Sequence, residues 1–209
     1  MINIDKKKYK IGENNYIKKK TKKDLIIIGD TCRSGSNHII RMQQKDFGNS
    51  REWNTFTISR DGKIYQHYNP DYYSDYSGDP KIDKRSISIL FENMNCLNAV
   101  DDKYYNWINE ECKDINNIYK KYWKSGYYWE KYTEEQYNSL AGLLIELFDK
   151  YKDIPNRIIA SNLYDSESYN YKGVLSRSNI SKEEVDVNPS FDYKKLITLL
   201  SEKIEIVVD

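Results

Sequence analysis

Histidine is nearly missing from this chain of 209 residues, which has only His38 and His67. The two do not stand at the spacing that puts a pair of zinc ligands on one helix or hairpin. Cysteine is also scarce, because Cys32, Cys96 and Cys112 form neither a CxxC pair nor an even set. This pattern argues against a disulfide framework and favours a reducing compartment.

Long apolar runs and an excess of one charge are absent as well. No run approaches the roughly 20 apolar residues that span a bilayer. The first residues are not followed by the apolar stretch of a signal peptide, so we expect synthesis in the cytoplasm and no membrane span. The 33 Lys and Arg residues and 32 Asp and Glu residues leave a formal net charge of +1. Such a chain has no strong field to attract nucleic acid.

Several familiar catalytic patterns are missing too. The chain has no Gly-rich phosphate loop. The aspartates spaced through residues 71–83 lack the EF-hand pattern and its closing glutamate. Ser176 and Ser178 have no neighbouring histidine that would activate a serine nucleophile.

Aromatic residues, by contrast, are plentiful: they are 14% of the chain, and 20 of them are tyrosines. These side chains can fill a core and can also form aromatic, partly polar surface that binds other molecules. The lysines cluster in residues 6–23, so we divide the chain into a basic arm, 1–23, and a single domain, 24–209. We expect the arm to be solvated, with a short strand near 9–11. The alternative is that it contacts an acidic partner.

Four segments predict strands. The β-branched run at 25–28 is typical of a central strand covered on both faces. Two alternating segments, 56–59 and 63–66, flank Asp61-Gly62, which predicts a hairpin with a type I′ turn. The alternating run at 86–91 predicts a strand beside the first one.

Helical patterns follow. Thr133 and Gln136 form a capping box before a stripe of apolar residues at three- and four-residue steps, and Pro155 ends this helix. We also expect a short helix over 34–42, a short strand at 158–159 and a last helix beginning near 188–189. The polar, aromatic insertion at 93–132 has helical spacing between 107 and 122. Strands alternating with helices predict an α/β fold, a mixed central β-sheet flanked by helices.

Short motifs stand in order along the chain at 26–31, 56–65, 86–93, 173–179 and 185–192. Together they resemble the superfamily of N-acetylmuramoyl-L-alanine amidases and peptidoglycan-recognition proteins. The chain reads Ile-Ile-Ile-Gly-Asp-Thr at 26–31, where the family has an apolar strand followed by His-His-Thr. Residues 56–65 are similar to the family's second strand with its Asp-Gly turn, and 86–93 to its Ser-Ile-Gly-Ile-Glu-x-x-Asn. Residues 173–179 and 185–192 resemble Gly-Ile-x-Ser-His-Ser-Asn and Asp-x-Asn-Pro-x-Phe-Asp. The resemblance implies the amidase fold over roughly 24–200.

The resemblance also implies where zinc ligands would stand, and two of the three are replaced. The first histidine position is Gly29 and the second is Arg177, whereas the third ligand is kept as Asp186. Glycine offers no donor atom, and a protonated guanidinium repels a dication. The family's Tyr and His of the second strand fall at Asn54 and Thr55. We therefore expect no metal, no cofactor and a degenerate catalytic site.

A fixed cation in place of the metal is one interpretation of this pattern. It places Arg177 where zinc would lie, paired with Asp186 and with Asp30. The alternative is that Arg177 points to solvent. A second alternative is a weak divalent-metal site built from Cys32, Asp30 and Asp186.

The expected function is a catalytically degenerate amidase-fold protein. It would bind a peptidoglycan- or muropeptide-like ligand, or a protein partner in an assembly such as a phage virion or tail. We predict that Arg177, Asp186, Asp30, Trp53 and Trp129 contact the ligand. The aromatic residues at 123–129 form either a satellite cluster under the insertion or an exposed binding patch. The alternative function is an active, endolysin-like N-acetylmuramoyl-L-alanine amidase that takes zinc at a rearranged site.

Overall fold

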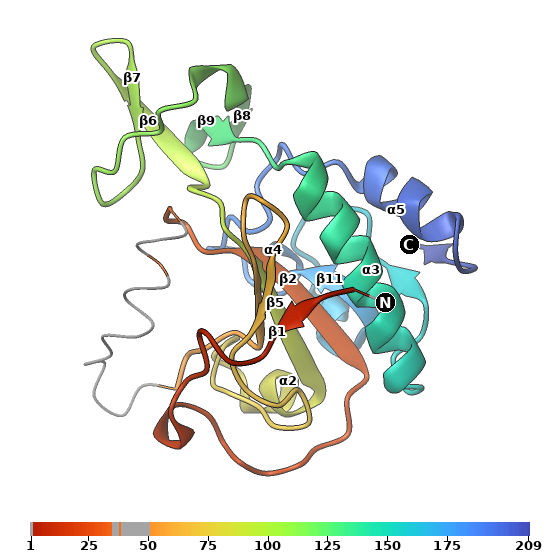
Figure 1. Cartoon of the computed structure of the whole chain (residues 1–209). Helices are drawn as coiled ribbons and strands as arrows, with labels where there is room; N and C mark the ends of the chain where they lie inside the picture. Colours follow the sequence, from red (N-terminus) through yellow and green to blue (C-terminus); the bar gives the residue numbers. More distant parts are fainter. Residues whose placement is uncertain (1, 35–37, 39–50) are drawn as a thin grey trace.

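An eight-stranded mixed sheet forms the centre of the molecule (Figure 1). The structure is a computed structural model and describes residues 2–34, 38 and 51–209. The sheet has the order β1-β4-β3-β5-β2-β11-β10-β12. Its strands are β1 (Ile4–Asp5), β2 (Leu25–Asp30), β3 (Phe56–Ile58), β4 (Ile64–Gln66), β5 (Ser86–Phe91), β10 (Arg157–Ile158), β11 (Gly173–Ser176) and β12 (Val207–Val208). Only the β3–β4 pair is antiparallel among these strands.

Strand β2 is the most deeply placed of these elements. All six of its residues are buried, and it pairs in parallel with β5 on one side and β11 on the other. Its continuous β-branched run suits a strand that meets packed side chains on both faces. The predicted central strand and its neighbour are therefore confirmed. The strand continues through Gly29 to Asp30, beyond the predicted end, and so carries both residues into the sheet.

Helices cover both faces of this sheet, which confirms the predicted fold class. The helices α3 (Glu134–Lys150) and α5 (Tyr193–Ser201) pack on the face that holds Ile26 and Ile28. The short helices α2 (Pro80–Arg85) and α4 (Arg177–Ile180) supply Ile82 and Ile180 to the opposite face. The two faces bury alternate residues of β2, as the two-residue period of a strand requires.

The helix boundaries differ from the predicted ones in detail. The capping box of α3 is present as predicted, with Gln136 N donating to Thr133 Oγ1 at 3.1 Å. The helix ends at Lys150, before Pro155 is reached. The last helix begins at Tyr193 because Asp192 caps it, and not near residues 188–189. The helix predicted over 34–42 falls almost entirely outside the described residues.

The predicted hairpin is confirmed, but its turn is not of type I′. Of the predicted central pair, Asp61 and Gly62, only Gly62 has a positive φ, at 78°. The turn runs from Ser59 to Gly62 and is closed by the Gly62 N–H, which donates to Ser59 O at 2.9 Å. The Asp61 carboxylate accepts from Ser59 Oγ at 2.5 Å, which fixes the loop from within. Asp61 thus stabilises the turn through its side chain, without the left-handed conformation that type I′ demands.

The basic arm packs against the domain and is not a solvated extension. Strand β1 at its start pairs with β4, which places the arm on one edge of the main sheet. Ile11 and Tyr16 are buried, and the Ile11 N–H donates to His67 O at 3.0 Å. The strand predicted near 9–11 is therefore displaced to Ile4–Asp5. The many lysines of the arm led to the prediction of a solvated segment, although its few apolar residues pack against the domain.

The insertion forms a second, smaller sheet instead of the predicted helix. Its order is β7-β6-β9-β8, with β6 (Cys96–Val100), β7 (Lys103–Tyr105), β8 (Ile118–Trp123) and β9 (Gly126–Glu130). Figure 1 shows this sheet standing apart from the main one at one end of the molecule. Its aromatics divide between the two predicted roles: Trp129 is fully buried, whereas Tyr127 is exposed. The aromatic and β-branched residues that suggested helical turns suit a half-buried sheet better.

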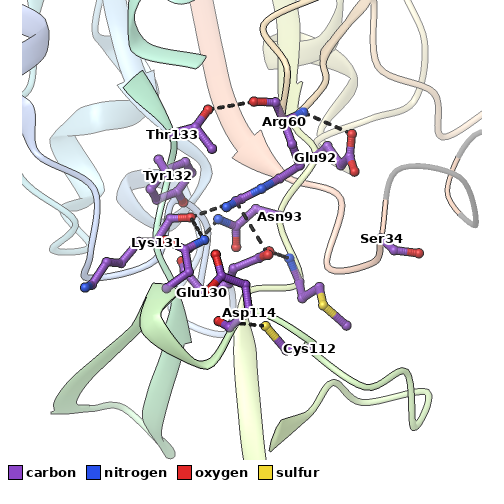
Figure 2. A network of polar contacts seen from close by, with 12 residues as sticks. Ser34, Arg60, Glu92, Asn93, Cys112, Asp114, Glu130, Lys131, Tyr132 and Thr133 are labelled. Atoms are coloured by element: carbon purple, nitrogen blue, oxygen red, sulfur yellow. Dashed lines mark hydrogen bonds and ion pairs between the residues drawn. The ribbon is translucent and has the colours of Figure 1, made fainter. Parts of the chain in front are cut away.

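Arg60 joins the small sheet to the main domain (Figure 2). Its guanidinium donates to Lys131 O at 2.7 Å and lies 3.6 Å from the carboxylate of Glu130, which closes β9. Its main-chain N–H donates to Glu92 just after β5, and its carbonyl accepts from Thr133 at the start of α3. One residue thereby contacts the ends of three elements.

We expect Arg60→Ala to lower the free energy of unfolding by about 2 kcal/mol, because it removes a hydrogen bond to the Lys131 carbonyl and the cation beside the buried Glu130. Urea unfolding followed by circular dichroism measures this. Arg157→Ala is the matched control, since it breaks an exposed pair with Asp209 that should contribute far less to stability. Equal losses in the two variants would show that Arg60 is no more than a surface arginine.

No helix among the described residues has the length and apolar character needed to cross a membrane.

Candidate functional site

A cavity of about 540 Å³ opens where strand β2 ends. Asp30 and Cys32 lie at this end of the strand, and Trp53, Tyr76 and Arg177 enter from three other segments of the main domain. Trp107 reaches the same cavity from the small sheet. Clefts at the carboxyl ends of parallel strands commonly bind ligands in α/β proteins.

Gly29 sits beside this cavity with no room for a side chain. A Cβ added there would lie 2.7 Å from Tyr76 Oη and 3.0 Å from Asp186 Oδ2. Both of these atoms are buried and have no hydrogen-bond partner among the described residues. The volume that a side chain at position 29 would occupy is therefore held by a phenol and a carboxylate.

Asp30 is buried and its carboxylate is well supplied with donors. Tyr132 Oη lies 2.7 Å from both carboxylate oxygens, and Asn95 Nδ2 donates to Oδ2 at 2.8 Å. Burial, and next the neighbouring Asp186, raise the pKa of this carboxyl well above its usual range. Asp30 thus belongs to a buried polar network beneath the cavity.

Asp186 lies next to Asp30 and faces Arg177. Asn95 Nδ2 bridges the two acids, since it also lies 3.3 Å from Asp186 Oδ1. Arg177 Nη1 lies 3.7 Å from Asp186 Oδ2, and Arg177 Nη2 lies 2.8 Å from Glu184 Oε1. Burial raises the pKa of Asp186 to about 6, although the guanidinium lowers it. Arg177 is thus held between two carboxylates.

Arg177 keeps part of its surface toward the cavity. Its side chain is 28% exposed, and its guanidinium carbon lies 5.0 Å from the centre of the Tyr76 ring. Its two carboxylate partners are Asp186 and Glu184, whereas Asp30 is satisfied by Tyr132 and Asn95. The prediction that Asp30 is the second carboxylate partner of Arg177 is therefore wrong, because that partner is Glu184.

Cys32 points at the acid pair without joining it in a metal-binding arrangement. Its Sγ lies 3.6 Å from Asp186 Oδ1, at hydrogen-bonding distance for a thiol. Burial, and next the charges of Asp186 and Asp30, raise the pKa of the Cys32 thiol well above its usual range.

Other predicted site residues lie in different places. Trp53 lines the cavity, as a ligand-contacting residue must. Trp129 does not: it is fully buried in the small sheet, where its indole N–H donates to Lys121 O at 2.8 Å. We therefore remove Trp129 from the candidate site, because a residue without exposed surface cannot contact a ligand.

Asn54 and Thr55 are buried beside the sheet and make internal hydrogen bonds. Asn54 Nδ2 donates to Thr57 Oγ1 at 2.8 Å, and Thr57 Oγ1 lies 2.8 Å from His67 Nε2. His67 is fully buried, and its other ring nitrogen contacts Tyr9 O. This ring fastens the arm to the sheet.

The sequence was compared with known proteins. The profile of the N-acetylmuramoyl-L-alanine amidase family matches residues 19–172, most of the chain. The chain belongs to the N-acetylmuramoyl-L-alanine amidase family. The match ends before Arg177 and Asp186, so the assignment does not depend on those two residues. None of the curated proteins matches the chain.

Solved structures agree with this family at the level of the fold. The amidase LysC from Clostridium intestinale is 14% identical with a TM-score of 0.55, and the match covers 96% of this chain and 99% of LysC. PlyL is 12% identical with a TM-score of 0.56, covering 97% of this chain and 100% of PlyL. AmiD from E. coli, solved with a muropeptide substrate, is 13% identical with a TM-score of 0.55 and matches 85% of this chain and 57% of its own.

The residues at this amidase-fold site do not fit zinc. Position 29 has neither a donor atom nor space for one, and the cation Arg177 lies against the one acid retained from the expected ligand set. Within residues 2–34, 38 and 51–209, no three His, Cys, Asp or Glu side chains are grouped so as to hold a metal ion. A catalytic zinc needs three such donors with an open fourth position.

Sequence reasoning missed three residues that surround the acid pair. Asn95, Tyr132 and Tyr76 come from segments far apart in the chain. Asn95 has a positive φ of 61°, which marks a special position but leaves no trace in the sequence pattern. Tyr132 stands directly before the capping box that was recognised, so its place at the start of α3 was the one available signal.

Proposed function

We propose that this member of the amidase family binds a peptidoglycan fragment in the cavity at the end of β2 and does not hydrolyse it. The observation that carries the proposal is the filled space at Gly29. Tyr76 Oη and Asp186 Oδ2 take the volume of the missing side chain, and Arg177 lies on the remaining acid. A fixed guanidinium can donate hydrogen bonds to a ligand carbonyl or carboxylate, but it cannot activate water as a metal does.

Several features support a peptidoglycan fragment as the ligand. The structural neighbour AmiD was solved with anhydro-N-acetylmuramic acid-L-Ala-D-gamma-Glu-L-Lys. The cavity of this chain combines the aromatic rings of Trp53, Tyr76 and Trp107 with the donors of Arg177. Aromatic surface with a few placed polar groups suits a ligand that is part sugar and part peptide. The predicted place of the protein in a phage virion or tail stays a prediction from its composition.

Active amidase chemistry is the second candidate function. It is favoured by the family match over residues 19–172 and by neighbours that are named as amidases. It would require zinc at donors other than those expected from the family. The two candidates therefore differ in metal content and in the products they release.

We expect metal-free protein, given one equivalent of zinc and desalted, to retain close to none by elemental mass spectrometry. We also expect it to sediment with insoluble peptidoglycan without releasing soluble muropeptides. An active amidase of the same family serves as the positive control for release. A zinc ratio near one together with released stem peptides would establish the second candidate. Failure to sediment, with no release, would refute peptidoglycan binding altogether.

A further inference from the structure

Trp107 is an exposed aromatic residue at the edge of the cavity. It follows strand β7 of the small sheet and has 62% of its surface exposed. It lines the cavity together with Trp53 and Tyr76, which belong to the main domain and are buried. Exposing so much indole surface is unfavourable in water, so a fixed, exposed tryptophan at a cavity is a candidate for ligand contact.

The orientation of the indole is fixed by two contacts. Its Nε1–H donates to Cys32 O at 2.9 Å, which ties the ring edge to the segment after β2. The Arg33 guanidinium lies over the ring, with its central carbon 4.4 Å from the ring centroid. A cation over a tryptophan face is a favourable arrangement. Since the N–H is already used, the indole offers a ligand only flat, apolar surface.

The turn that carries Trp107 is itself held against the cavity wall. Asn106 Oδ1 accepts from the main-chain N–H groups of Ile108 and Glu110, at 3.1 Å and 2.9 Å. Asn106 Nδ2 donates to Glu110 Oε2 at 2.7 Å, and Ser34 Oγ donates to Glu110 Oε1 at 2.6 Å. The turn is thus braced before any ligand arrives, which lowers the entropy cost of binding.

We propose that Trp107 is an aromatic platform for the apolar face of a sugar ring in the ligand. The inference rests on the proposed function, and it assigns the glycan part of the fragment to Trp107 and the peptide part to the polar cavity floor at Arg177. A peptide backbone would be recognised by hydrogen bonds, for which Trp107 has no unused donor. The C–H face of a pyranose needs only the flat ring that Trp107 presents.

Isothermal titration of the full chain with two probes tests this assignment. The probes are N-acetylmuramoyl-L-alanyl-D-isoglutamine and the same dipeptide without its sugar. Trp107→Ala should weaken binding of the muramoyl probe about 10- to 30-fold, the range of a hot-spot side chain. It should leave binding of the sugar-free dipeptide unchanged. Trp107→Phe should restore most of the lost affinity.

Tyr122→Ala is the matched control, because Tyr122 is an exposed aromatic residue of the same small sheet and does not line the cavity. It should bind both probes like the unaltered chain. Tryptophan fluorescence should change when the unaltered chain binds the muramoyl probe, and this change should be smaller in Trp107→Phe even when the probe is bound, because only Trp53 then remains in the cavity.

The outcomes separate the two proposals. If the unaltered chain binds the muramoyl probe and Trp107→Ala binds it equally well, the platform is refuted while the proposed function stands. Equal weakening of both probes would also refute it, since Trp107 would then act on the site as a whole. If the unaltered chain binds neither probe, the proposed function and the platform fall together.

Discussion

Arg177→Ala should lower the free energy of unfolding by about 3 kcal/mol at pH 7, because removing one member of a buried ion pair leaves an uncompensated charge. Asp186 is only 1% exposed, and Arg177 is its sole cationic partner among the described salt bridges. The loss measures how strongly the guanidinium compensates the buried acid. Urea unfolding at fixed ionic strength gives the value.

The loss should depend on pH with a definite sign. Burial raises the folded-state pKa of Asp186 to about 6, above the ordinary value of 3.8, so the folded state binds the proton more tightly than the unfolded one. Stability contributed by this group therefore falls as the pH rises from about 4 to about 6. Without Arg177 the folded pKa rises further, and the fall extends to higher pH. The difference between Arg177→Ala and the unaltered chain should be smaller at pH 5 than at pH 8.

A double variant supplies the control. Arg177→Ala with Asp186→Asn removes the buried charge and should recover most of the lost stability at pH 8. The pair then shows a large coupling energy in a double-mutant cycle. A loss that is independent of pH and is not recovered by Asp186→Asn would mean that Arg177 acts by packing against Tyr76, and not by compensating charge.

Rebuilding the family's ligand set should create a zinc site in this fold. The variant combines Gly29→His and Arg177→His with Tyr76→Ala, and Asp186 remains as the third ligand. Tyr76 must be shortened because its hydroxyl lies 2.7 Å from the position of a Cβ at residue 29. We expect about one zinc per chain after desalting, because two imidazoles and a carboxylate complete a common three-ligand set.

Two related variants make this result specific. Adding Asp186→Ala to the rebuilt chain should remove the bound zinc. Gly29→His alone should lower the melting temperature without conferring zinc binding, since its side chain meets both Tyr76 and Asp186. A rebuilt chain that is folded, as judged by its thermal transition, and still retains no zinc would refute the placement of the ligand positions at Gly29, Arg177 and Asp186.

Strands β2 to β5 of the main sheet could be predicted from the sequence because their signals are local and strong. A strand or a helix is indicated within a few residues by the β-branched run of β2, by the alternation of β5 and by the capping box of α3. The small sheet could not be predicted, because the spacing of its aromatic residues fits both the period of a helix and the period of a strand. Its register depends on pairing between β6 and β9, which are about 30 residues apart in the chain. Short apolar stretches cannot decide between helix and strand by periodicity alone.

The residues of the candidate site could likewise be predicted only in part. The replaced positions Gly29 and Arg177 were visible as departures from a family motif. Their surroundings were not, because Tyr76 and Asn95 reach the site through loops whose course no local pattern specifies. Trp129 was misplaced for a related reason: an aromatic residue in a polar insertion can cover either a core or a ligand, and only its neighbours decide which.

The arm at the start of the chain also determines which strand forms one edge of the main sheet. Strand β4 is short and would be an open edge of the main sheet if β1 did not pair with it through Ile4 and Asp5. An uncovered edge strand is a template for pairing with another chain. The lysine-rich residues that follow β1 surround this edge with like charges. The segment predicted to be solvated thus supplies the edge strand itself, which is only two residues long and is followed by lysines. A short edge flanked by charge is a poor template for pairing with another chain.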